Sequence, residues 1–115
     1  MKNFPEHFSE LNNWMEKLGV EIPEVMKNFS DLHKSSLKSG ALDKKTKELI
    51  ALGIAITVRC DGCISFHVHD ALKAGANKNE IAETVSVAIL MGGGTSVVYG
   101  VEAMQALDQY NDQGL

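Results

Sequence analysis

The amino-acid sequence has 115 residues, 44% hydrophobic and 23% charged, and its 15 acidic and 11 basic side chains give a net charge of -4. This length predicts a single domain, residues 1–115, and the composition argues against disorder. No run or stripe of Lys and Arg stands out, which argues against nucleic acid as a partner.

The most apolar segment of the chain is LIALGIAITV, residues 49–58. This segment is shorter than the about 20 apolar residues that a helix needs to cross a bilayer. The opening MKNFPEHFSE lacks the apolar stretch and the cleavage site of a secretory signal. We therefore expect a cytoplasmic protein without a membrane partner. In that compartment a cysteine pair is more often redox-active or metal-binding than a permanent structural disulfide.

Helical patterns begin near the start of the chain. A first helix is predicted over residues 9–18, with Ser9 as its N-cap and Gly19 as its stop, and a second over residues 23–38. Apolar side chains recur at helical spacing in both, and we expect them to point inward: Leu11, Trp14, Met15 and Leu18 in the first, and Val25, Met26, Phe29, Leu32 and Leu37 in the second.

A third helix is expected to begin after Asp43, which can cap it. From Leu49 onward this helix is apolar on every side, and a helix of that kind is normally central. A fourth helix is predicted over residues 61–73, so the chain's two cysteines fall at its start.

Asn77 and Glu80 form a capping box for a fifth helix that reaches residue 91 or so. After the glycines at 92–94, Thr95 can cap a sixth helix that runs to about Tyr110. The glycine triplet is expected to break the chain between two helices and not to hold a phosphate, because no strand or Lys-Ser/Thr pattern accompanies it. The fold class is therefore all-α, a single-domain bundle of about six helices.

The last two helices are nearly all apolar, which is unusual for a monomer of this size. We expect residues 85–91 and 97–101 to form a subunit interface, since an exposed apolar patch this wide promotes association. The alternative is that the core of one chain absorbs them.

The segment CDGCISFH places Cys60 and Cys63 one helical turn apart. Residues three apart share a helix face, with Cα atoms about 5–6 Å apart, inside the range that a disulfide requires. The positive end of the helix dipole favours a thiolate at the same place. This pattern is typical of dithiol–disulfide exchange.

His67 follows Cys63 by four residues, so its imidazole can meet that thiol and take or return its proton. His69 points about 200° further round the helix and cannot serve the same thiol. For His69 we expect a solvated or interface position.

Two other interpretations of the motif remain open. Cys60, Cys63 and His67 could be three zinc ligands, although a structural zinc site takes four, and His7 and His33 stand alone in other helices. The two cysteines could also be small apolar side chains packed in a core, with His67 bonded to a backbone carbonyl.

The segment KELIALGIAITVRCDGCISFHVHDALKAGANKNEIAE resembles the alkylhydroperoxidase D-like branch of the carboxymuconolactone decarboxylase family. The resemblance rests on Glu48, on the CxxC pair twelve residues later and on His67, and it extends over roughly residues 40–105. It implies an all-α fold that assembles as a homotrimer or homohexamer.

The resemblance also implies a thiol-dependent oxidoreductase, a peroxidase or disulfide reductase that acts on alkyl or hydrogen peroxides without a cofactor. Cys63 would attack the peroxide, Cys60 would resolve the product, and His67 and Glu48 would relay protons. A lipoyl-bearing or thioredoxin-like protein could donate electrons. The wider family implies one alternative, a decarboxylase for a small carboxylated substrate. The zinc interpretation of the motif leaves another, a non-catalytic metal-binding or assembly protein.

One position departs from the resembled branch, whose best-studied members have a histidine directly before the second cysteine. This chain has Gly62 there. The departure implies weaker peroxidase activity, and it favours a general disulfide reductase or another natural substrate as a variant.

The position of Glu48 does not follow from its spacing. In a simple hairpin of helices turning at Cys60, Glu48 would lie about 18 Å from the hinge and His67 about 10 Å. Direct contact is then not expected, and a crossing of the helices, a water or a neighbouring subunit would have to join the two groups. The alternative is that Glu48 is one more charge in the opening turn of its helix.

Overall fold

The computed structural model describes residues 2–115, and this part of the chain forms six helices and no strand. The helices are α1 (Phe4–Glu21), α2 (Pro23–Leu37), α3 (Lys44–Thr57), α4 (Asp61–Lys73), α5 (Lys78–Gly92) and α6 (Gly94–Asp112). The predicted all-α fold class is confirmed, and two of the predicted caps are present. Asp43 accepts from Thr46 N–H, and Asn77 and Glu80 cap each other's backbone at the start of α5.

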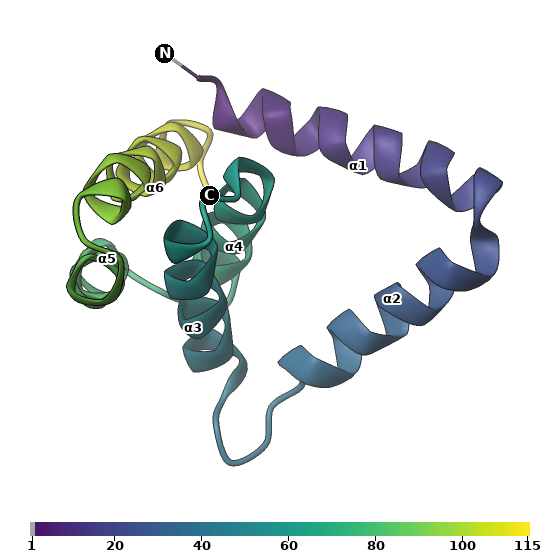
Figure 1. Ribbon diagram of the computed structural model, residues 1–115, viewed down its shortest axis with the longest axis horizontal. Coiled ribbons are helices and arrows are strands. Elements are labelled where there is room, and N and C mark those ends of the chain that lie inside the picture. Colours follow the sequence, from purple (N-terminus) through teal and green to yellow (C-terminus); the bar gives the residue numbers. More distant parts are fainter. Residues whose placement is uncertain (1) are drawn as a thin grey trace.

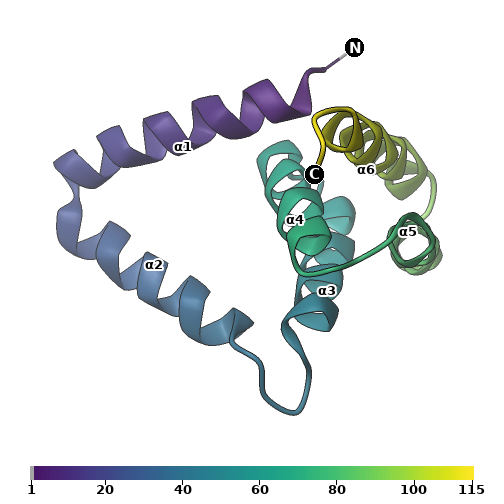
Figure 2. The same cartoon turned by 180° about the vertical axis from the view of Figure 1, so that it is seen from behind.

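Helices α3 to α6 pack into a bundle, and α1 and α2 project from one side of it (Figures 1 and 2). Helix α3 is central, as expected, because it packs against α2, α4, α5 and α6. The buried core consists mainly of aliphatic side chains from the bundle, among them Leu52, Ile56, Ile64, Val68 and Ile81.

The first helix is longer than predicted at both ends. It begins at Phe4, because the side chain of Asn3 accepts a hydrogen bond from Glu6 N–H at 3.0 Å. Gly19 does not stop it, and the helix ends at Glu21. The stop is Ile22, since the residue before a proline is forced out of the helical conformation, and here Pro23 follows.

The start of α6 also differs from the prediction. Thr95 lies inside the first turn, and the residue that precedes the helix is Gly93, with a φ of 71° that a side chain would disfavour. Gly92 permits the close approach, because a Cβ on it would lie 1.9 Å from the Ser96 oxygen. The glycines at 92–94 therefore break the chain between two helices, as predicted.

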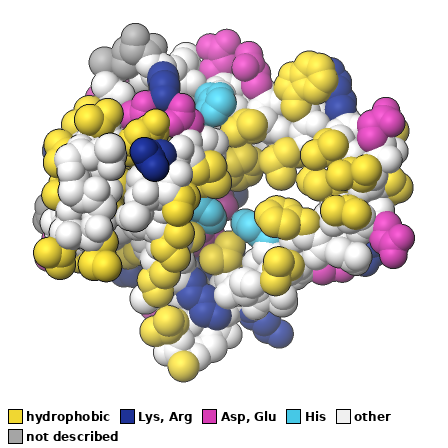
Figure 3. Space-filling view, in the orientation of Figure 1, with side chains coloured by type: hydrophobic (Ala, Val, Ile, Leu, Met, Phe, Trp, Pro, Cys, Tyr) yellow, Lys and Arg dark blue, Asp and Glu magenta, His cyan; other side chains and the backbone are white. Residues whose placement is uncertain are grey.

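The inward orientation predicted for the first two helices is wrong for most of their apolar side chains. Trp14 is 63% exposed and Leu32 58% exposed, whereas the ends of the helix pair are anchored by buried Phe4 and Leu37. We call α1 and α2, residues 4–37, the arm. Its two helices pack on each other and reach the bundle mainly at their ends, which leaves a hollow between the arm and the bundle (Figure 3).

No helix in the described part of the chain combines the length and the hydropathy needed to cross a bilayer.

Candidate active site at the start of helix α4

A tight turn between α3 and α4 sets the position of the cysteine pair. Arg59 has a φ of 60°, in the left-handed region that side chains other than glycine seldom adopt. The N–H of Cys60 then donates to the carbonyl of Ala55 at 3.1 Å. The reversal places Cys60 at the N-cap of α4 and Cys63 in its first turn.

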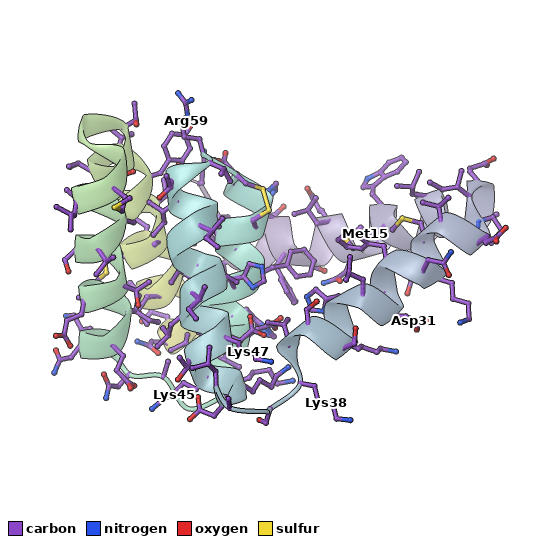
Figure 4. All side chains as sticks on the ribbon, turned by 60° about the horizontal axis from the view of Figure 1, so that its bottom comes forward. Met15, Asp31, Lys38, Lys45, Lys47 and Arg59 are labelled. Carbon is purple, nitrogen blue, oxygen red and sulfur yellow. A yellow bond between two sulfur atoms is a disulfide. The ribbon has the colours of Figure 1, made fainter. Side chains whose placement is uncertain are left out.

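Cys60 and Cys63 are joined by a disulfide, with their Cα atoms 5.2 Å apart. The Cys63 N–H also donates to the Cys60 sulfur at 3.2 Å. Both cysteines are half-buried, and the disulfide lies at the opening of α4 (Figure 4). The helix start thus accommodates the bridged form without losing its cap, and both sulfurs stay near the positive end of the helix dipole.

His67 and Glu48 are in direct contact, contrary to the expectation from their spacing. The His67 Nδ1 lies 2.8 Å from Glu48 Oε1. The hairpin estimate failed because α3 ends at Thr57 and α4 begins at Asp61. Measured from those ends, Glu48 is about 13.5 Å and His67 about 9 Å along its helix, and two long side chains close this smaller difference.

The contact assigns different tasks to the two nitrogens of His67. An ionised carboxylate can only accept a hydrogen bond, so Nδ1 of the neutral ring carries the proton. Nε2 then has a lone pair that can accept one. The Glu48 side chain is fully buried, and its second oxygen lies 3.8 Å from Lys44 Nζ. The contact therefore fixes the orientation of the ring and leaves Nε2 as the nitrogen that can take a proton from a thiol.

His69 does not have the position predicted for it. Its ring stacks on Phe8 at a centroid distance of 4.2 Å, and its Nδ1 lies 2.9 Å from Asp70 Oδ1. The side chain is 18% exposed, so the solvated position expected for it is wrong. It is packed here because the first turns of α1 cover this side of α4, which the rotation about the helix axis alone could not indicate.

The N-terminal segment closes the back of the site through contacts that the sequence did not indicate. Lys2 forms ion pairs with Asp61, the first residue of α4, and with Glu102. The hydrogen bond from Lys2 holds the pKa of Asp61 below its usual value. Nearby, the hydroxyls of Ser65 and Tyr110 lie 2.8 Å apart, and burial raises the pKa of Tyr110.

The arm contributes two residues that sequence reasoning missed. The ring of His33 lies 6.4 Å from that of His67, centroid to centroid, with 17° between their planes. Leu11 covers the cysteine turn so closely that a Cβ on Gly62 would lie 2.8 Å from its Cδ1. No spacing rule links residues on α1 or α2 to residues on α4, so only the fold reveals these contacts.

Within residues 2–115, no group of three or more His, Cys, Asp and Glu side chains is arranged to hold a metal ion.

The sequence model of the Carboxymuconolactone decarboxylase family matches residues 23–106, which include all four predicted site residues. Among solved structures, apo-lpg0406, a carboxymuconolactone decarboxylase family protein from Legionella pneumophila, is 40% identical with a TM-score of 0.91. The match covers 96% of this chain and 98% of the other. An uncharacterised Cupriavidus necator protein is 34% identical over 90% of this chain and 91% of its own length.

A more distant relative has an assigned name. Alkyl hydroperoxide reductase AhpD from Coxiella burnetii is 28% identical over 74 residues, which are 64% of this chain and 42% of that protein. Together these matches support the resemblance to the alkylhydroperoxidase D-like branch that the Glu48, CxxC and His67 pattern indicated.

Proposed function

Because the chain belongs to the carboxymuconolactone decarboxylase family, we propose that it is a thiol-dependent oxidoreductase that reduces alkyl or hydrogen peroxides through a Cys60–Cys63 dithiol–disulfide cycle. One observation carries the proposal. A cysteine pair bridged at the start of α4 lies one turn from an imidazole that is hydrogen-bonded to a buried carboxylate.

The cycle begins with the reduced pair. His67 takes the proton of Cys63, and the thiolate attacks the nearer oxygen of the peroxide. The O–O bond breaks, Cys63 becomes a sulfenic acid, and the leaving alkoxide takes the proton from His67 and departs as an alcohol. Cys60 then attacks the sulfur of Cys63, and the disulfide forms with release of water.

Reduction completes the cycle. A donor thiolate attacks the disulfide, a second donor thiol resolves the mixed disulfide, and two electrons return to the cysteine pair. A lipoyl-bearing or thioredoxin-like protein fits this role, because each presents two thiols for exchange. A cytoplasmic location and a homotrimeric or homohexameric assembly form part of the same proposal.

The test is to replace each cysteine and follow peroxide consumption with dithiothreitol as donor. Cys63→Ser should abolish turnover, because the attacking sulfur is gone. Cys60→Ser is treated with one equivalent of peroxide in the absence of dithiothreitol, which would itself reduce a sulfenic acid. It should then keep a sulfenic acid on Cys63 that dimedone traps, detected by mass spectrometry.

Two results would contradict the mechanism. If both serine variants keep full turnover, the cysteine pair is not the redox centre. If activity toward a small carboxylated substrate appears and survives alkylation of both thiols, the decarboxylase alternative holds instead.

A further inference from the structure

His33 is the feature of the arm that the proposed cycle does not yet use. It lies on α2, 34 positions before His67 in the sequence, and its ring faces that of His67 at 6.4 Å and 17°. The side chain is half-buried, although the apolar residues around it on α2, such as Phe29 and Leu32, are mostly exposed. The arm therefore places the imidazole of His33 beside that of His67.

The hydrogen bond to Glu48 leaves the other ring nitrogen of His67, Nε2, available for proton exchange. The Nδ1 of His67 is hydrogen-bonded to Glu48, whose side chain is fully buried. His67 itself is 17% exposed. Proton exchange with solvent then goes through Nε2. Among the described residues, His33 is the titratable side chain whose ring stacks on that of His67.

The cysteine turn itself leaves no room for an imidazole nearer to the sulfurs. Leu11 of α1 lies over Gly62, so a side chain there would have to displace it. His69, the other histidine of α4, is held by Phe8 and Asp70. Among the described residues, His33 is the histidine whose ring packs beside that of His67.

We propose that His33 is a positioning residue of this site, which exchanges protons between His67 and the solvent in the hollow beneath the arm. A centroid separation of 6.4 Å is one that a single water molecule can bridge between two ring nitrogens. When a donor reduces the Cys60–Cys63 disulfide, the leaving sulfur needs a proton that the oxidation half of the cycle does not supply. His33 takes this proton from solvent and passes it through the water to Nε2 of His67, which delivers it to the sulfur. The inference rests on the proposed function.

The test compares His33→Ala with Lys34→Ala, an exposed neighbour on the same helix, in a dilute buffer without imidazole. Peroxide turnover of His33→Ala should fall about tenfold, since an indirect proton path contributes less than the acid itself. Added imidazole should restore the rate in proportion to its concentration, because it can carry the proton from the hollow. The Lys34→Ala variant and the wild type should not respond to imidazole.

A second variant separates proton exchange from packing. His33→Phe keeps a flat ring opposite His67 and removes both nitrogens, so it should be as slow as His33→Ala. Full activity in His33→Phe, or a loss in His33→Ala that imidazole does not relieve, would overturn the proposal.

A separate reaction keeps this inference distinguishable from the peroxidase proposal. Dithiothreitol reduces the Cys60–Cys63 disulfide in a single turnover, and the leaving sulfur takes a proton without any peroxide. Slower reduction in His33→Ala with imidazole rescue would support the role of His33 even if the wild type consumed no peroxide. If the wild type is an active peroxidase and the disulfide of His33→Ala is reduced at the wild-type rate, the role of His33 is refuted and the proposed function stands.

Discussion

Glu48 is the residue on which the chemistry of the candidate site most depends. Its carboxylate is fully buried, and burial of a charge is costly unless a partner compensates it. His67 at 2.8 Å and Lys44 at 3.8 Å are the groups that do so. The carboxylate orients the imidazole, the role that a buried acid has beside a catalytic histidine.

Glu48→Gln tests that role with little change in shape. The amide keeps the volume of the side chain but carries no charge, and it can present an N–H to His67 in place of an acceptor. We expect peroxide turnover to fall about a hundredfold, measured as kcat/KM in steady-state assays. Glu83→Gln, which removes an exposed carboxylate on α5, is the control and should have no effect. If Glu48→Gln keeps the wild-type kcat/KM, Glu48 has a packing role and no role in catalysis.

Asp61 makes the stability of the fold depend on pH. Lys2 holds the folded-state pKa of Asp61 below the ordinary 3.8, so the ionised carboxylate stabilises the fold above that pH. The stabilisation is lost as the pH falls through the lower, folded-state pKa. Asp61→Asn should therefore unfold more easily than the wild type near neutral pH and equally easily at strongly acidic pH.

Denaturant titrations over a pH series measure this difference. Asp31→Asn is the matched control, because it removes an ion pair with Lys27 that lies within one exposed helix. Equal destabilisation by Asp61→Asn at all pH values would show that the loss of packing, and not the loss of charge, is responsible.

At the scale of the elements, close helix packing and not helix propensity decides which glycines are required. Gly100 lies inside α6, where a Cβ would be 2.6 Å from Cγ1 of Val85 on α5. Gly53 lies inside α3, where the nearest atom to a Cβ would be Thr84 Cγ2 at 3.6 Å, an ordinary contact. Alanine should therefore be tolerated at position 53 but not at position 100.

The pair of variants gives opposite predictions for the same change. Gly53→Ala should stabilise the protein by up to about 1 kcal/mol through helix propensity. Gly100→Ala gains the same propensity but overfills the α5–α6 contact, which costs about 1–3 kcal/mol, and should be net destabilising. Thermal and denaturant unfolding measure both. If Gly100→Ala stabilises the protein, α5 and α6 can move apart easily and the predicted clash is wrong. If the clash is real, adding Val85→Ala to Gly100→Ala should relieve it.

At the scale of the whole molecule, the single chain leaves much apolar surface uncovered. The segments expected to form an interface are exposed only in part: Leu90 is 79%, Met91 75% and Val98 62% exposed, whereas the core of the chain absorbs Val85 and Ala88. The arm, which lies on the other side of the bundle from α5 (Figure 1), adds the exposed side chains of Trp14 and Phe29. An apolar surface of this kind is typical of a face that another subunit covers, so we expect the chain to act as a homo-oligomer.

Leu90→Lys tests the assembly directly. The wild type should have a mass in solution that is a multiple of the 12.5 kDa chain, and the charge placed in the apolar patch should reduce it. Analytical ultracentrifugation measures both masses. Leu42→Lys, which changes an exposed leucine in the loop between α2 and α3, should leave the mass unchanged. A monomeric wild type, or an unchanged mass in Leu90→Lys, would contradict an interface at this patch.

The sequence by itself determined the features that depend on neighbours along one helix. The caps at Asp43 and Asn77, the break at the glycine triplet and the one-turn separation of Cys60 and Cys63 follow from local geometry, and the structure has all of them. The family could also be predicted from the sequence, because the pattern that indicates it is the spacing of Glu48, the CxxC pair and His67. Where local signals competed, as with Gly19 and Pro23, the stronger backbone constraint of the proline prevailed.

Only the tertiary structure decided which helices meet, and with them the wider site. Glu48 and His67 touch because α3 ends three residues before the cysteine pair, and His33 and Leu11 reach the site because the arm folds back over α4. The apolar faces of the arm stay exposed for the same reason, since helical spacing shows that a face is apolar but not what covers it. Contacts between distant segments depend on the angles and offsets of helix packing, to which many residues contribute and which no short motif encodes.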